Sequence, residues 1–288
     1  MAKAASGAMQ DVAEAVRRAD RLTVVGSGTK TAFVGENEGA TPIRTEWLSG
    51  IRELSPADQV VVVGAGTRIE ELQAELRRQG QCLPLPSVEE FGALLAGMPG
   101  TVGGLVAMRM PHALEARCGS VRDWILGATV IRPDGEIAKS GSMAVKSVAG
   151  YDVHRLMVGS RGSFGLIAEV ILRTYPLRAL PLPRVTFGPC RDVGWNGIEH
   201  GEHLTIRRHL RSDVEAEASA ANDQLIAFDA ESATLWMVGD ASPVKATPHW
   251  SLYAHRRPHF DPPIGDWDRR AKATLDPTSK MNPGVWDE

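Results

Sequence analysis

Residues 146–170 read K-S-V-A-G-Y-D-V-H-R-L-M-V-G-S-R-G-S-F-G-L-I-A-E-V. The stretch holds four glycines and ends in an apolar run that is typical of a β-strand. It contains no acid–base pair, no metal-ligand spacing and no nucleophile elbow. Main chain this rich in glycine, running directly into a strand, is typical of backbone that lies against a flat or phosphorylated ligand. We therefore expect a large ligand held mainly by main chain.

Two further glycine loops share one pattern, a β-branched strand followed by V-G-x-G-T. A strand at 22–25 runs into residues 26–30, and a strand at 60–63 runs into residues 64–67. Peptide N–H groups in such loops bind anions, and a pyrophosphate offers negative charge to two loops. Each loop could instead be a tight β-turn, but the repetition favours the anion site. A third loop, G-T-V-G-G, follows at 100–104.

Neither V-G-x-G-T loop completes the dinucleotide-binding fingerprint G-x-G-x-x-G. The third glycine is replaced by Thr31 after the first loop and by Ile69 after the second. No clear strand ending in Asp or Glu follows at the required distance. The sequence therefore argues against a Rossmann nucleotide fold.

Periodicity predicts the main elements around these loops. A helix is expected at 10–20, with Val12 and Val16 on one face. After the second loop, Thr67 and Glu70 match a T-x-x-E capping box at the start of a helix that ends at Gly80. A strand is expected at 124–132, followed by a Pro-Asp-Gly turn and a return strand ending at Lys139.

Three prolines between Tyr175 and Pro183 mark a linker, and a last helix is expected from Asp266 to Asp276. The tryptophans Trp195, Trp236 and Trp250 are expected in the core of the region between them. We predict a large domain at 1–177, a smaller insert at 178–265, and a tail at 266–288 that returns to the first domain.

Composition excludes several classes of protein. The 288 residues carry a net charge of −3 without a basic stripe, so nucleic acid is not an expected partner. No apolar run reaches the roughly 18 residues that a transmembrane segment needs. The N-terminus lacks the apolar core of a signal peptide. The three cysteines form no C-x-x-C, so no iron–sulfur site of its own is expected, and an odd count indicates reduced thiols in the cytoplasm.

Seven motifs in order resemble those of the vanillyl-alcohol-oxidase-type (PCMH-type) FAD-binding flavoproteins, most closely the FAD-binding E subunits of bacterial glycolate oxidases. They are V-G-S-G-T-K (25–30), V-G-A-G-T (63–67), G-T-V-G-G-L-V-A (100–107), G-S-V-R-D-W-I-L-G (119–127), V-K-S-V-A-G-Y-D-V (145–153), V-G-S-R-G-S-F-G-L-I-A-E-V (158–170) and D-P-T-S-K-M-N-P-G (276–284). The resemblance implies an α+β fold of two FAD-binding subdomains, about 1–64 and 65–177. The insert at 178–265 would be a shortened cap or substrate domain, and the tail at 266–288 would return to the FAD site. It is weak over 180–265.

The same resemblance implies the residues that hold FAD. Main-chain donors to the pyrophosphate would come from the first and third loops: Gly26, Ser27, Gly28, Thr29, Lys30, Gly100, Thr101, Val102, Gly103 and Gly104. Ser120 and Asp123 would lie beside the ribose and adenine, and Gly165 and Ile167 would contact the adenine end. Gly150, Tyr151 and Asp152 would run near the flavin, and Asn282 would reach the isoalloxazine ring. The first loop has neither His nor Cys, and Cys118 is expected to be a packed thiol, so FAD is expected to be non-covalent.

The catalytic groups are harder to assign. His255 is a candidate base and Arg256, with Arg257, a candidate site for a substrate carboxylate, although these arginines could equally dock a partner, which we favour. The H-x-x-H at 200–203 is expected to be solvated rather than metal-binding, and no metal site is expected.

The resemblance leads to two functional hypotheses. In the first, the chain is an FAD-dependent oxidoreductase subunit that oxidises a small 2-hydroxy acid such as glycolate. A companion FAD subunit and an iron–sulfur subunit would be its partners, in the cytoplasm or at a membrane through those partners. In the second, suggested by the short insert, it is a non-catalytic flavin-holding assembly or electron-transfer subunit. An aldonolactone or sugar oxidase of the same fold is a third possibility by analogy alone.

Overall fold

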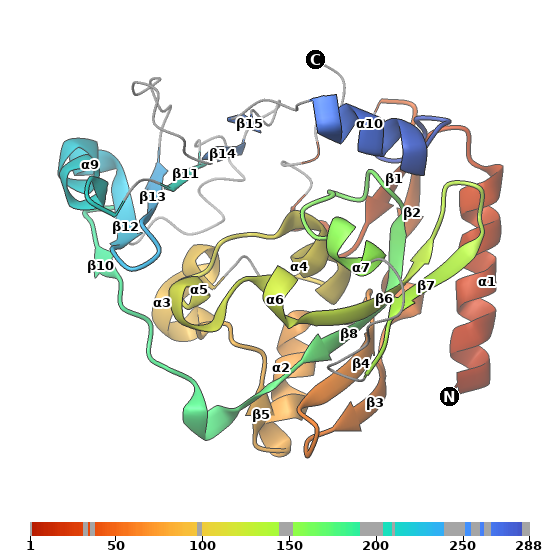
Figure 1. The fold of residues 1–288 in the computed structure, drawn as a ribbon, viewed down its shortest axis with the longest axis horizontal. Coiled ribbons are helices and arrows are strands. Elements are labelled where there is room, and N and C mark those ends of the chain that lie inside the picture. Colours follow the sequence, from red (N-terminus) through yellow and green to blue (C-terminus); the bar gives the residue numbers. More distant parts are fainter. Residues whose placement is uncertain are drawn as a thin grey trace.

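The computed structural model describes residues 2–30, 34, 38–96, 100–143, 152–190, 204–208, 211–238, 251–254, 260–261 and 266–283. Within these residues the fold mixes helices and sheets, as Figure 1 shows. No helix in the described ranges is both long enough and apolar enough to cross a bilayer.

The centre of the molecule is a five-stranded sheet in the order β3-β4-β8-β6-β7, in which every neighbouring pair is antiparallel. Its strands are β3 (Ile51–Ser55), β4 (Val60–Gly64), β6 (Ile125–Ile131), β7 (Ile137–Gly141) and β8 (Leu166–Arg173). The predicted strands at 60–63 and 124–132 and the return strand are therefore confirmed, although β6 starts one residue after Trp124. The apolar end of the opening stretch is β8, which lies between β4 and β6.

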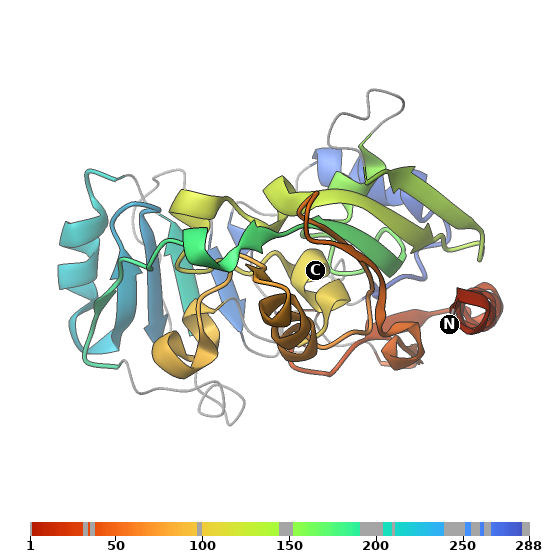
Figure 2. The same ribbon diagram turned by 90° about the horizontal axis from the view of Figure 1, so that it is seen from below.

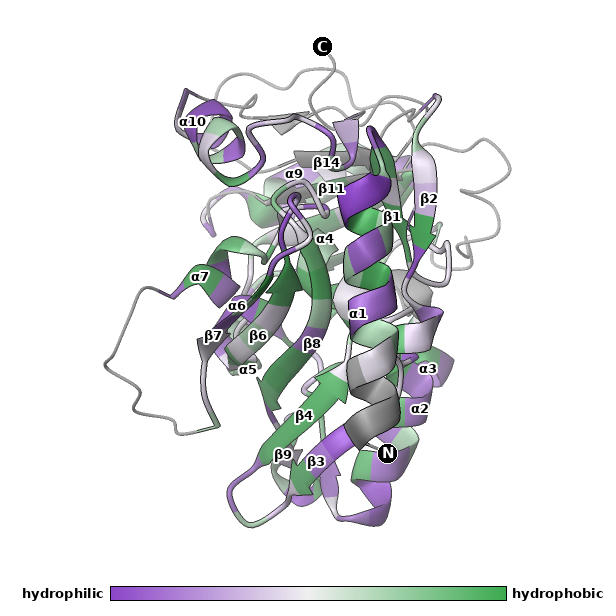
Figure 3. Cartoon of the chain, turned by 90° about the vertical axis from the view of Figure 1, so that its right-hand side faces the viewer, coloured by the Kyte–Doolittle hydropathy of each residue, from purple (hydrophilic) through white to green (hydrophobic). Residues whose placement is uncertain are grey.

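Helices α2 (Ile69–Arg78), α4 (Val102–Met108) and α6 (Val121–Trp124) pack on this sheet. The spacing of Ile69, Leu72 and Leu76 puts all three on one face of α2, and all are buried. They join the apolar side chains of β4 and β8 in the main core cluster, and Figure 3 shows the apolar colour concentrated on these inner strands.

The predicted capping box at Thr67 is wrong. Helix α2 begins at Ile69 with Arg68 at its N-cap, and no side chain caps it. The Thr67 hydroxyl instead accepts a hydrogen bond from Gly50 N at 2.8 Å. The Thr67 hydroxyl thus serves as the acceptor of a partly buried N–H group of another segment rather than as a helix cap.

The N-terminal part of the chain forms a smaller unit. Helix α1 (Ala2–Arg18) is longer than the predicted 10–20 and buries Val12 and Val16, and β1 (Leu22–Val25) pairs in parallel with β2 (Thr41–Arg44). A short 3-10 helix, η2 (Glu46–Leu48), follows. β3 and β4 pair within the central sheet, and the predicted subdomain boundary near residue 64 stays a prediction.

The insert forms a six-stranded antiparallel sheet in the order β10-β12-β13-β11-β14-β15 with helix α9 (Val214–Ala221). Its strands are β10 (Thr186–Phe187), β11 (Leu204–Arg208), β12 (Leu225–Asp229), β13 (Thr234–Val238), β14 (Ser251–Ala254) and β15 (Phe260–Asp261). Trp236 is fully buried, as predicted for this core, whereas Trp195 and Trp250 lie outside the described residues. Figures 1 and 2 place this sheet and α9 together, on the side of the molecule away from α1.

The insert packs against the segment at 95–117 through an apolar cluster and an ion pair. Trp236 and Ile206 of the insert share a cluster with Leu95 and Met108. The Arg117 guanidinium donates two hydrogen bonds of 2.9 Å to the Glu231 carboxylate. The remaining elements are β5 (Gln81–Cys82), paired with β9 (Tyr175–Pro176) in the predicted linker, α3 (Val88–Leu95), α5 (Glu115–Cys118), α7 (Val153–Leu156), η3 (Leu177–Ala179), η4 (Asn222–Gln224) and α10 (Asp266–Leu275).

Candidate functional site

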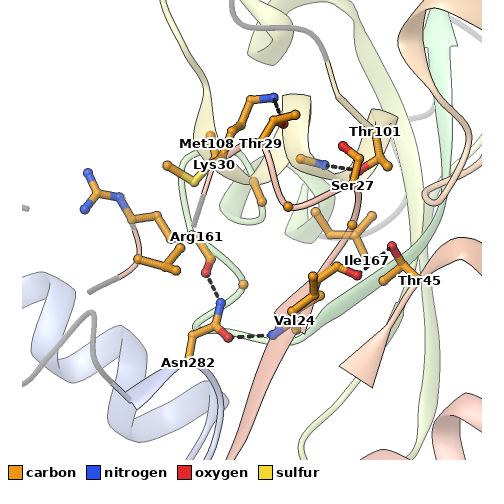
Figure 4. Close-up of a pocket in the computed structure, with 18 of the residues that line it drawn as sticks. Val24, Ser27, Thr29, Lys30, Thr45, Thr101, Met108, Arg161, Ile167 and Asn282 are labelled. Atoms are coloured by element: carbon orange, nitrogen blue, oxygen red, sulfur yellow. Dashed lines mark hydrogen bonds between the residues drawn. The ribbon is translucent and has the colours of Figure 1, made fainter. Parts of the chain in front are cut away.

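A pocket lies where the end of β1, the start of α4 and the loop before β8 meet, with about 680 Å³ of empty space including its open mouth. Its lining includes most of the residues predicted for the cofactor: Gly26, Ser27, Gly28, Thr29, Lys30, Thr101, Gly103, Gly104, Gly165, Ile167 and Asn282. These residues come from four segments that are far apart in the sequence. Figure 4 shows Lys30 and Asn282 at opposite ends of the site.

The first and third glycine loops interlock along one wall. A side chain on Gly26 would collide with the Thr101 side chain. A Cβ on Gly100 would lie 2.6 Å from Thr29 Oγ1 and 2.8 Å from Lys30 Nζ. Gly28 has φ +78°, a conformation that side chains rarely adopt, but a Cβ there would point into open space. Glycine at positions 26 and 100 therefore allows the first and third loops to approach each other closely, and glycine at position 28 allows the backbone to turn.

The third loop has fewer main-chain donors to offer than the sequence suggested. Val102 N donates to Thr67 O at 2.9 Å, and Gly103 N donates to Ala65 O at 2.7 Å. Thr101 caps α4, because its hydroxyl accepts from Gly104 N at 3.2 Å. These three N–H groups are used within the protein. Gly103 and Gly104 still line the pocket, whereas Gly100 and Val102 are not part of its lining.

The second V-G-x-G-T loop does not line the pocket. Residues 64–67 are buried, and a Cβ on Gly64 or Gly66 would collide with the carbonyl oxygen of Leu48 or Thr45. Since this loop accepts the N–H groups of Val102 and Gly103, it supports the third loop from behind. The expectation that both V-G-x-G-T loops face one pyrophosphate is wrong.

Two buried cations set the electrostatics of the site. Lys30 is 7% exposed and Arg161 is 8% exposed. Burial lowers the pKa of Lys30 to about 8 and the pKa of Arg161 to about 9. The described lining contains no aspartate or glutamate, so the pocket suits an anion.

Asn282 joins two walls of the pocket. Its Oδ1 accepts a hydrogen bond from Val24 N at 2.7 Å, and its Nδ2 donates to Arg161 O (Figure 4). Both polar atoms of the amide thus contact main chain. This geometry supports a clamp between β1 and the glycine-rich loop at 159–165, which we call the fourth glycine loop. The predicted contact of Asn282 with the isoalloxazine ring stays a prediction.

The other predicted residues lie elsewhere. Ser120 and Asp123 form a capping box on α6, where Asp123 Oδ2 accepts from Ser120 N at 2.8 Å, and they are not in the pocket lining. Asp152 is exposed and pairs with Arg155 at 3.5 Å. Gly150, Tyr151, His255 and Arg256 lie outside the described residues.

Sequence reasoning missed part of the lining. Arg161 and Gly162 lie in the pocket, and both stand inside the quoted motif V-G-S-R-G-S-F-G. Arg161 is the one charged residue in that motif, and this charge could have marked it as a pocket residue. Thr45 and Met108 also line the pocket, and no signal in the sequence marks them. Within the described ranges no group of His, Cys, Asp and Glu side chains could hold a metal ion.

Part of the chain is similar to known FAD-binding proteins. Residues 4–141 match the family model described as FAD binding domain. The chain is 31% identical over 185 residues to glycolate oxidase subunit GlcE of Escherichia coli, a match that covers 64% of this chain and 49% of that protein. It is also 31% identical to a mitochondrial D-lactate dehydrogenase (cytochrome) of Arabidopsis thaliana, over 53% of this chain and 26% of that protein.

The matches span half or less of the length of these relatives. Among solved structures, an alkyldihydroxyacetonephosphate synthase aligns with a TM-score of 0.47 at 16% identity, covering 73% of this chain and 34% of that one.

Proposed function

We propose, from the FAD-binding domain at residues 4–141, that the pocket binds FAD non-covalently and that the chain is the FAD-binding subunit of a glycolate oxidase-type complex acting on a small 2-hydroxy acid. The observation that carries this proposal is the interlocked pair of glycine loops around buried Lys30. Small residues leave main chain bare against the ligand, and a buried ammonium in a lining without described carboxylates favours a pyrophosphate.

Different residues of the site would hold different parts of the cofactor. The first loop, Gly26 to Lys30, would hold the pyrophosphate, with the Lys30 ammonium opposing its charge. Asn282 and the fourth loop would hold the walls in place at the opposite end of the pocket. The chemistry that FAD supplies when bound is acceptance of a hydride from the substrate carbon that carries the hydroxyl group.

The hydroxyl proton needs a separate base. The described lining contains no His, Asp or Glu that could take it. His255 remains the candidate base and Arg256 the candidate for the substrate carboxylate. By the name of its E. coli relative, this chain would work beside other subunits, for which we propose a companion FAD subunit and an iron–sulfur subunit that takes the electrons onward.

A direct test is reconstitution of the purified chain with FAD. We expect flavin absorbance to stay with the protein through gel filtration and to be released by acid precipitation, because the bond is non-covalent. The matched control is Lys30→Met, which should retain less flavin while folding normally. Wild-type protein that emerges colourless would reject the proposal.

The short insert and the absence of an acid–base residue from the described lining favour one alternative, a non-catalytic flavin-holding or electron-transfer subunit. Anaerobic addition of glycolate or D-lactate separates the two. Bleaching of the flavin in the isolated chain supports direct oxidation, and bleaching only after the partner subunits are added supports the alternative. A panel that includes aldonolactones and sugars tests the third possibility.

A further inference from the structure

The C-terminal tail extends the small β1–β2 sheet. Lys280 O accepts a hydrogen bond from Leu22 N at 2.8 Å, and Asn282 N donates to Leu22 O at 2.8 Å. Met281, between them, is fully buried. The sequence positions of Asn282 and Val24, which are joined by a hydrogen bond, differ by 258 residues. The main chain of β1 therefore fixes where Asn282 stands.

The amide of Asn282 then fits a space that only glycine leaves. A Cβ on Gly162, which has φ +73°, would lie 2.7 Å from Asn282 Nδ2. The bonds from Val24 N and to Arg161 O connect the strand that enters the first glycine loop with the fourth loop. Movement of Asn282 would change the spacing between these two walls.

A buried ion pair holds the tail in this position. Lys272 Nζ donates to Asp276 Oδ2 at 2.7 Å, to Met281 O at 2.8 Å and to Ser163 O at 2.9 Å. Asp276 Oδ2 also accepts from Met281 N at 2.9 Å. The two side chains are 8% and 0% exposed. The Lys272–Asp276 pair thus connects α10 with Met281, the residue before Asn282, and with Ser163 of the fourth loop.

We propose that Lys272 and Asp276 are positioning residues of the cofactor site, which act through Asn282 to set the separation of the first and fourth glycine loops. Neither residue lines the pocket. The inference rests on the proposed binding of FAD. The physical basis of the proposal is that the Lys272 ammonium donates three hydrogen bonds, to Asp276, Met281 and Ser163. Removal of the ammonium would therefore break all three contacts at once.

The test is a double-mutant cycle with FAD affinity as the readout, measured by quenching of flavin fluorescence. Lys272→Met and Asn282→Ala should each raise the Kd for FAD roughly tenfold, because either change releases the spacing of the two loops that the cofactor would bridge. The double variant should be no weaker than the worse single variant, since both act on one contact. Additive effects, or a wild-type Kd in folded Lys272→Met, would overturn the proposal.

Two further variants keep the test decisive. If Lys272→Met does not fold, K272M/D276L removes both charges and leaves no buried ion without a partner. Gln73→Leu is the matched control, because the Gln73 amide also makes two buried main-chain bonds, to Leu83 N and Leu83 O, but away from the pocket. It should lower thermal stability and leave the Kd unchanged. Failure of the wild type to bind FAD would reject the proposed function, whereas normal binding by K272M/D276L would reject only the positioning role.

Discussion

Thr101 occupies the space that a side chain at Gly26 would need, so the first and third glycine loops touch at this point. The Thr101 hydroxyl is also the N-cap of α4. It cannot move aside without giving up its bond from Gly104 N. The contact ties the shape of the cofactor pocket to the start of a helix.

Gly26→Ala should therefore weaken FAD binding strongly while the protein still folds. The added methyl group must displace either the first loop or Thr101. Calorimetric titration with FAD measures the effect. Gly7→Ala is the control, since nothing lies within 4 Å of a Cβ there. That change lies in α1 and should stabilise the helix by up to about 1 kcal/mol without altering FAD affinity. Equal affinities for both variants would contradict the contact.

Affinity for FAD should fall as the pH rises above about 8. Burial lowers the pKa of Lys30 to about 8 in the protein alone, so the amine is charged below this pH and neutral above it. An adjacent pyrophosphate would raise that pKa again, so binding above pH 8 takes up a proton. The Kd should rise by up to about tenfold for each pH unit in this range.

Two variants check the assignment to Lys30. Lys30→Met should bind weakly and lose the fall in affinity that begins near pH 8, because no amine remains to titrate there. The dependence on pH that is left belongs to Arg161, whose pKa burial lowers to about 9. Lys30→Arg should bind more tightly than Lys30→Met and move the fall in affinity to higher pH, toward the pKa of about 9 that burial gives Arg161. A wild-type profile that matches Lys30→Met would disprove the role of Lys30.

Thr67→Val should lower stability without altering FAD affinity in the folded protein. The substitution keeps the shape of the side chain but removes the acceptor of Gly50 N, at a cost of about 1–3 kcal/mol. Urea denaturation gives the stability and flavin fluorescence gives the Kd. A marked loss of affinity would mean that the second loop takes part in binding after all.

Trp236→Ala should destabilise the protein by about 3–5 kcal/mol, because it opens a cavity in the cluster that joins the insert to the helices around the pocket. Trp267→Ala is the matched control. Trp267 is 81% exposed and stacks only with Arg270 among the ring contacts of the described residues. Its loss should change the free energy of unfolding by less than about 0.5 kcal/mol. Similar urea midpoints for the two variants would argue against the cluster as the joint.

Much of the local structure followed from residue patterns. The β-branched runs at 22–25 and 60–63 are strands, the apolar exit after Gly165 is the central strand β8, and the last helix spans Asp266–Leu275. Each of these elements has a period or a boundary residue that depends only on near neighbours. The capping box at Thr67 failed because a distant N–H group, that of Gly50, took its hydroxyl.

The sequence by itself determined that four glycine-rich segments occur and that their motifs resemble those of FAD-binding flavoproteins. Only the tertiary structure decided what each segment does. Two copies of V-G-x-G-T are alike in sequence, yet one faces the pocket and the other is buried as its support. The physical reason is that a main-chain donor serves a ligand only where no other segment has already supplied an acceptor, and that depends on contacts between residues far apart in the chain.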